Sequence, residues 1–352
     1  MINLLNLFKL FYFVIPFLFY IIPVILSYNT GDITFHFYTT HTFLFNDLVK
    51  IFLGHVLLGL IIINIFSKKG YLLIINKQSL LIDLLVVFIF IILSFFNAMN
   101  IINMLLFSLL IVLLSNWRPR NITFSILLII ALSQMVLNED RFAVVFVLLL
   151  WLLPFLSNRS ILTLFVLSLM GIFILIFGLQ PMRYNELPFS NILNITDSLG
   201  YFYQHLSPIY MTAGLAQSID FSTTSLFAEF IPFGKSLFGE LGTVERLARE
   251  GLPTVLINEG TRLGSNSSMY FSWIGIVALI IMLSFIKFNM EVLKSRILTN
   301  SIFLYFISQG PYFIRRSFAS FTIDIILIIF WVLFISGVLL IVKNKRIIKY
   351  EK

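Results

Sequence analysis

Residues 79–116 read SLLIDLLVVFIFIILSFFNAMNIINMLLFSLLIVLLSN. The stretch consists of two apolar runs, 79–97 and 100–116, which are separated by a short break and carry a single charged residue, Asp83. A helix needs roughly 20 mostly apolar residues to cross about 30 Å of hydrocarbon. Both runs approach that length, so the stretch predicts two membrane-spanning helices joined by a tight turn.

The same pattern recurs along most of the 352 residues, of which 59% are hydrophobic and only 11% charged. The mean hydropathy is +1.01. A soluble domain of this size could not cover so much apolar surface. We therefore predict an all-α polytopic membrane protein with about ten transmembrane helices, near 9–28, 50–67, 79–97, 100–116, 122–138, 142–157, 161–179, 268–287, 299–314 and 320–342.

The basic residues of the tails and short loops predict the orientation of these helices, because Lys and Arg are enriched on the cytoplasmic side. With the carboxy terminus inside, the short outer loops hold only Lys50, Arg141, Arg315 and Arg316. The inner side receives fifteen basic residues: Lys9, Lys68, Lys69, Lys77, Arg118, Arg120, Arg159, Lys287, Lys294, Arg296, Lys343, Lys345, Arg346, Lys349 and Lys352. Both termini are thus predicted to be cytoplasmic.

This scheme divides the chain into three parts. Residues 1–179 hold the first seven transmembrane helices, and residues 268–352 hold the last three with a basic cytoplasmic tail. Residues 180–267 form one long extracytoplasmic loop with short helices, in which Phe, Tyr and Leu occur throughout. Because loops longer than about 15 residues are usually functional or disordered, we expect this aromatic-rich loop to fold against the outer mouth of the helices.

The enrichment of Lys and Arg on the cytoplasmic side does not account for arginines outside the membrane. Anion binding is one explanation for them. A guanidinium group binds diphosphate oxygens in a bidentate manner, with charge-assisted hydrogen bonds about twice as strong as neutral ones. The candidates are Arg183, Arg246, Arg249 and Arg262 in the long loop, with Arg315 and Arg316 in the last outer turn.

Structural explanations stand beside this one. Arg249 lies four residues after Glu245, and Arg246 lies four before Glu250, which are ordinary spacings for ion pairs on a helix surface. Arg183, Arg315 and Arg316 could extend to the interface from a helix end.

A base is the second requirement for many transfer reactions. His205 is the only histidine of the long loop and the only side chain there whose unperturbed pKa lies near neutrality. Glu186 and Glu259 are the competing carboxylates, together with Asp220 and Glu229. Within the predicted spans, an acid is a functional candidate by default; Asp324 is one, whereas Asp83 lies close to the inner interface and is expected to reach water.

The residue types and motifs that the sequence lacks exclude several classes of function. The chain has no cysteine, which excludes disulfides and thiolate chemistry. The sequence shows no P-loop, dinucleotide-binding motif or metal-ligand spacing, so neither a cofactor nor a metal is expected. Basic residues are spread between apolar runs, which argues against a nucleic-acid partner.

In layout, residues 180–342 resemble Wzy-type O-antigen polymerases. The likeness rests on Gly251-Leu252-Pro253-Thr254 followed by Ser272-Trp273-Ile274-Gly275 where the long loop returns to the helices. It rests also on YQHLSP at 203–208, on Arg315-Arg316-Ser317-Phe318, and on the Arg-x10-Gly spacing of Arg249 and Gly260. The first half of the chain matches only as generic spans.

This resemblance implies a C-type glycosyltransferase-like enzyme of the bacterial inner membrane, with its active site facing the periplasm. Its substrates would be oligosaccharide repeat units on undecaprenyl diphosphate, and its other partners membrane lipids, a flippase and a chain-length regulator. The arginines would stabilise the departing diphosphate, and His205, Glu186 or Glu259 would accept the proton of the attacking hydroxyl.

Three other functions remain open. An O-antigen ligase would use the same donor with the lipid A core as acceptor. A glycosyltransferase using a lipid-monophosphate sugar would place a catalytic acid in the first outer loop, where Asp32 lies. A flippase or transporter would favour internal repeats and spans broken by Gly or Pro, and the sequence shows no such repeat.

Overall fold

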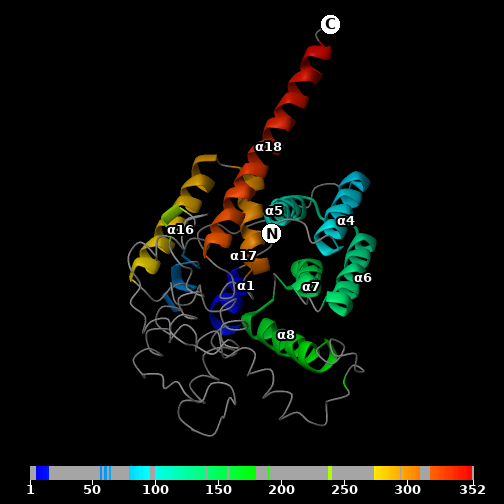
Figure 1. Ribbon diagram of the computed structural model, residues 1–352, viewed down its shortest axis with the longest axis vertical. Helices are drawn as coiled ribbons and strands as arrows, with labels where there is room; N and C mark the ends of the chain where they lie inside the picture. Colours follow the sequence, from blue (N-terminus) through cyan, green and yellow to red (C-terminus); the bar gives the residue numbers. More distant parts are fainter. Residues whose placement is uncertain are drawn as a thin grey trace.

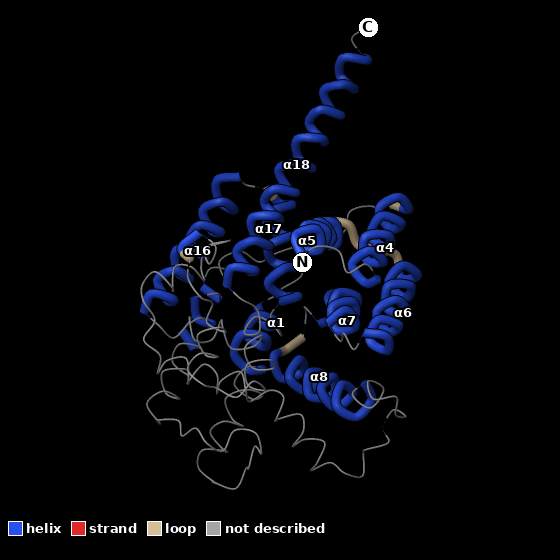
Figure 2. Tube along the Cα trace, in the orientation of Figure 1, coloured by secondary structure: helices blue, strands red, loops and turns tan. Residues whose placement is uncertain are grey.

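The computed structural model describes a set of packed helices. It describes residues 5–15, 56–57, 59–61, 63–64, 79–95, 100–138, 142–156, 159–179, 189, 237–239, 273–293, 295–309 and 318–350. Within these ranges the regular structure is entirely helical, and no strand is present (Figure 2). The predicted all-α class is therefore confirmed for this part of the chain.

The helices coincide with most of the predicted apolar runs. In the first half they are α1 (Leu5–Lys9), the π-helix η1 (Leu10–Val14), α4 (Leu80–Phe95), α5 (Asn100–Asn116), α6 (Asn121–Asn138), α7 (Phe142–Leu156), α8 (Ile161–Phe173) and the π-helix η3 (Ile174–Leu179). In the second half they are α16 (Trp273–Leu293), α17 (Arg296–Gln309) and α18 (Phe318–Tyr350).

None of the helices within the described ranges combines the length and the apolar character needed to cross a membrane.

Local sequence explains several helix ends. Ser160 caps α8, since its side chain accepts a hydrogen bond of 3.2 Å from the backbone N–H of Thr163. Ser295 does the same for α17 through the N–H of Leu298, at 3.3 Å. Hydroxyl side chains at this position satisfy N–H groups that have no partner within the helix. Pro119 lies just beyond α5, where its ring disfavours a helical conformation for Arg118.

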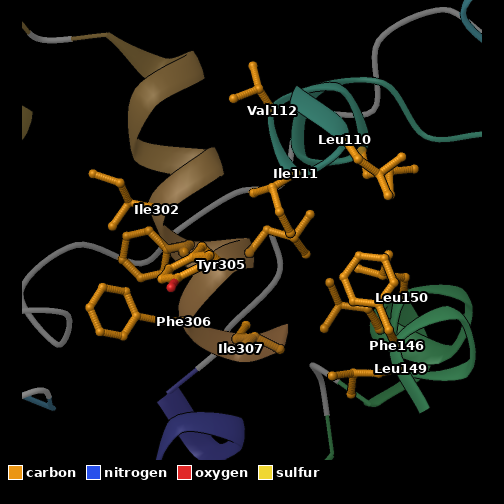
Figure 3. Packing of buried hydrophobic residues seen from close by; sticks show 14 of the residues in the cluster. Leu110, Ile111, Val112, Phe146, Leu149, Leu150, Ile302, Tyr305, Phe306 and Ile307 are labelled. Atoms are coloured by element: carbon orange, nitrogen blue, oxygen red, sulfur yellow. The ribbon is translucent and has the colours of Figure 1, made fainter. Parts of the chain in front are cut away.

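Two helices, α5 and α17, form the centre of the packing. Helix α5 lies against α4, α17 and α18, and α6 packs on α4 and α7 (Figure 1). Helices α5, α7 and α17 direct apolar side chains into a common interior, among them Ile111, Leu150 and Ile302 (Figure 3). Every residue of α17 from Asn300 to Gln309 is buried. This helix therefore contributes its polar side chains to the interior.

Helix α18 is longer than the predicted span 320–342. It runs for 33 residues to Tyr350, so Lys343, Lys345, Arg346 and Lys349 of the expected tail lie within the helix. Its last turns project beyond the other helices (Figure 1).

Candidate functional site

The residues predicted to form the anion site and the base lie outside the described residues. They are Arg183, Glu186, His205, Arg246, Arg249, Glu259, Arg262, Arg315 and Arg316. Their mutual geometry therefore stays a prediction. Arg315 and Arg316 belong to the connection between Gln309, the last residue of α17, and Phe318, the first residue of α18. The polar residues of these two helices are consequently the described groups nearest in sequence to the predicted arginine pair.

Asp324 of α18 and Tyr305 of α17 form a buried polar pair. The Tyr305 hydroxyl donates to Asp324 Oδ2 at 2.9 Å, and both residues are completely buried. A carboxyl group in such a place is costly to bury unless it is hydrogen-bonded. The hydroxyl group of Tyr305 supplies such a bond to Oδ2, and a functional role for Asp324 stays a prediction.

A second contact holds α17 one residue further along the helix. The Tyr12 hydroxyl of η1 donates to the backbone carbonyl of Phe306 at 2.7 Å. Phe306 and Tyr305 are adjacent in sequence, so two neighbouring residues of α17 are bound to two different helices. This end of α17 is therefore held by both η1 and α18.

The opposite end of α17 carries a layer of amides and hydroxyls shared with α5. Ser115 and Ser301 lie 2.9 Å apart between their Oγ atoms, and Asn116 Nδ2 lies 2.7 Å from Ser115 Oγ. Asn300 Nδ2 donates to Asn116 Oδ1 at 3.3 Å. These side chains satisfy one another in the interior, which is the usual function of small polar residues between packed helices.

Gln309 differs from the other buried polar residues of α17. Its side chain is only 1% exposed, and neither Nε2 nor Oε1 has a hydrogen-bond partner. Sequence reasoning missed Gln309 and Tyr305. The available signal was their spacing, since Ser301, Tyr305 and Gln309 recur every four residues and so share one face of the helix.

Asp83 corrects one prediction. It was expected to reach water, but it is only 5% exposed, and its Oδ2 lies 3.4 Å from Nε of Arg120. The backbone explains the difference, because Arg120 immediately precedes α6, and α6 packs on the helix that carries Asp83. Nearby, partial burial lowers the pKa of the Arg118 guanidinium from its ordinary value.

The described residues were also compared with the requirements of a metal site. In the ranges that the structure describes, no three His, Asp or Glu side chains lie close enough together to hold a metal ion.

Comparison of the chain with models of protein families, with curated proteins and with solved structures finds no match.

Proposed function

We propose that the chain is a multi-pass protein of the bacterial inner membrane that polymerises O-antigen repeat units on the periplasmic face. The proposal has two parts, a membrane location and a glycosyl transfer reaction. Each rests on its own observations.

The membrane location is supported by helices that are apolar on both their inner and outer faces. In α4, Val86 and Ile89 are buried while Leu81 is 76% exposed and Phe88 is 61% exposed. In α18, Ile328 and Val332 are buried while Phe330 and Phe334 are about half exposed. A helix that is apolar all round is normally surrounded by protein or by lipid. Exposed apolar side chains repeated along several helices favour lipid as the solvent of these faces.

The transfer reaction is supported by the chemistry of the predicted outer segments. Residues 180–267 and the outer turn at 315–316 supply the arginines, and the same segments carry the resemblance to Wzy-type polymerases. The observation that carries this part is the adjacent pair Arg315 and Arg316, which has no acidic residue nearby in sequence. Two guanidinium groups suit the bidentate binding of a diphosphate.

The proposed reaction joins two lipid-linked oligosaccharides. A hydroxyl oxygen of the acceptor unit bonds to the anomeric carbon of the donor chain, and the bond from that carbon to the diphosphate oxygen breaks. Undecaprenyl diphosphate leaves with the electron pair of the broken bond, stabilised by the arginines. The acceptor proton passes to a base, for which His205 is the first candidate and Glu186 and Glu259 are the alternatives.

The lipopolysaccharide of a cell lacking this chain tests the proposal. Such a cell can still make single repeat units, flip them and ligate one to the core. Its lipopolysaccharide should therefore show core plus one repeat and no long ladder on a gel. A missing ligase would instead leave the core bare while polymer accumulates on the carrier lipid, and a missing flippase would leave no repeat outside. Either of these two patterns would refute the polymerase function.

A further inference from the structure

The side chain of Gln309 is an exception among the buried polar groups of α17. Asn300, Ser301 and Ser308 are also buried on this helix, and each forms a side-chain hydrogen bond of 3.3 Å or less. Gln309 is 1% exposed, and both polar atoms of its amide lack a partner. More than about 90% of buried polar groups in proteins are hydrogen-bonded, so an exception calls for an explanation.

Stability does not explain this glutamine. A buried polar group without a partner costs about 1–3 kcal/mol relative to one that is satisfied. An apolar side chain of similar length would fill the same volume without that cost. A residue that opposes folding in this way is characteristic of sites that serve a ligand.

The surroundings of Gln309 are suited to a binding site. One helical turn before it, Tyr305 is bound to Asp324 of α18 at 2.9 Å, and Phe306 is bound by Tyr12 of η1 at 2.7 Å. One turn before Gln309, α17 is therefore held by both η1 and α18. Precise binding requires such rigid support. Gln309 is also the last residue of α17, and so it lies at an end of the helix.

We propose that Gln309 binds a hydroxyl-bearing sugar of the lipid-linked substrate, an inference that rests on the proposed function. The argument is chemical. The amide offers two N–H donors at Nε2 and an acceptor at Oε1, and both atoms lack a partner. A phosphate oxygen only accepts and would leave Oε1 unsatisfied, whereas sugar hydroxyls both donate and accept. The carbohydrate, rather than the diphosphate, is thus the part of the substrate that satisfies this side chain.

Binding of two lipids by the purified full-length protein in nanodiscs tests this inference. One lipid is undecaprenyl diphosphate, and the other is undecaprenyl diphosphate carrying N-acetylglucosamine. Gln309→Met keeps the length of the side chain and removes both hydrogen-bonding atoms. We expect it to weaken binding of the sugar-bearing lipid about tenfold, as the loss of two hydrogen bonds implies. Binding of the sugar-free lipid should not change, and the melting temperature should stay equal or rise.

A matched control is available on another helix. Gln134 of α6 is 3% exposed, so it is a glutamine of similar burial. Gln134→Met should leave the binding of both lipids unchanged. Gln309→Asn provides a second variant, because it keeps the amide but withdraws it by one methylene, and it should also weaken binding of the sugar-bearing lipid.

Several results would overturn the inference. They are wild-type protein that binds both lipids equally, a Gln309→Met variant that keeps wild-type binding, or an equal loss in Gln134→Met. The proposed function fails separately, through the gel pattern of the deletion strain. If Gln309→Met lost sugar binding while the deletion strain kept a long ladder, the sugar site would stand and the polymerase function would fall.

Discussion

The hydroxyl groups of Ser115 and Ser301, 186 residues apart in sequence, lie 2.9 Å from each other in the interior. This contact joins α5 to α17 and, with Asn116 and Asn300, closes a layer of buried hydrogen bonds. Among the described residues it links the two halves of the chain, which lie on either side of the predicted long loop.

Replacement of Asn116 by alanine should destabilise the fold. Asn300 loses the acceptor that lies 3.3 Å away, while Ser115 and Ser301 each keep a bond to a backbone carbonyl. We expect a loss of about 1–2 kcal/mol, measured as a lower melting temperature in detergent. Ser133→Ala is the control, because this exposed hydroxyl bonds only within its own helix. Equal melting of the two variants would show that the layer contributes nothing.

The ion pair between Asp83 and Arg120 predicts a coupled effect. Arg120 is 43% exposed but the Asp83 side chain is only 7% exposed, so the buried carboxylate depends on its cation. Arg120→Gln should lower the free energy of unfolding by roughly 1 kcal/mol, a value limited by the solvent around the arginine. Adding Asp83→Asn should restore most of the loss, since the unpaired charge is then removed. Strictly additive losses in the double variant would contradict the coupling.

The predicted topology can be tested with single cysteines, because the chain has none of its own. A cysteine at Ser222 in the long loop should react with an impermeant thiol reagent added to spheroplasts. A cysteine at Glu291, which is exposed in the last turn of α16, should react only after permeabilisation. Reaction of both from outside would overturn the orientation.

Lysine should not replace the arginines of the predicted anion site without loss of activity. Arg315→Lys and Arg316→Lys keep the charge but lose the planar fork that binds a diphosphate. We expect most of the polymerisation to be lost in each lysine variant and nearly all in each alanine variant, with Arg249 and Arg183 next in importance. The readout is the lipopolysaccharide ladder at matched protein level. Tolerance of alanine at all four positions would exclude the site.

Replacement of His205 should change the length of the polysaccharide chains. General-base catalysis is typically worth about 10²–10⁴-fold in rate, so His205→Ala should shift the ladder towards short chains. A wild-type ladder would exclude His205 as the base. Glu186→Gln and Glu259→Gln would then be the variants to compare, with Ser222→Ala as a control in the same loop.

Within the described residues, the positions of the helices could be predicted from the sequence, but the faces that they bury could not. Apolar runs such as 79–97 and 100–116 stand out because few polar residues interrupt them. Leu81 and Val86 are both apolar, yet the first is 76% exposed and the second fully buried. Where a helix is apolar all round, hydrophobicity no longer distinguishes the inner from the outer face.

The sequence predicts the chemistry of the candidate site, namely arginines, a base and an acid at Asp324, and these roles stay predictions. The contacts of the described polar residues could not be predicted. The bond of Asp324 to Tyr305 and the missing partners of Gln309 depend on how α17 packs against its neighbours. Tyr305 and Asp324 lie on different helices, 19 residues apart, and the sequence does not show that they are in contact.

The extension of α18 beyond the other helices provides a site for attaching a fluorescent label. A helix of 33 residues rises about 50 Å at 1.5 Å per residue, and its final turns stand clear of the packed bundle (Figure 1). A fluorescent protein inserted after Tyr350 would be held away from the interior by this helix. The protein could then be followed through expression, purification and reconstitution without disturbing the contacts of α17.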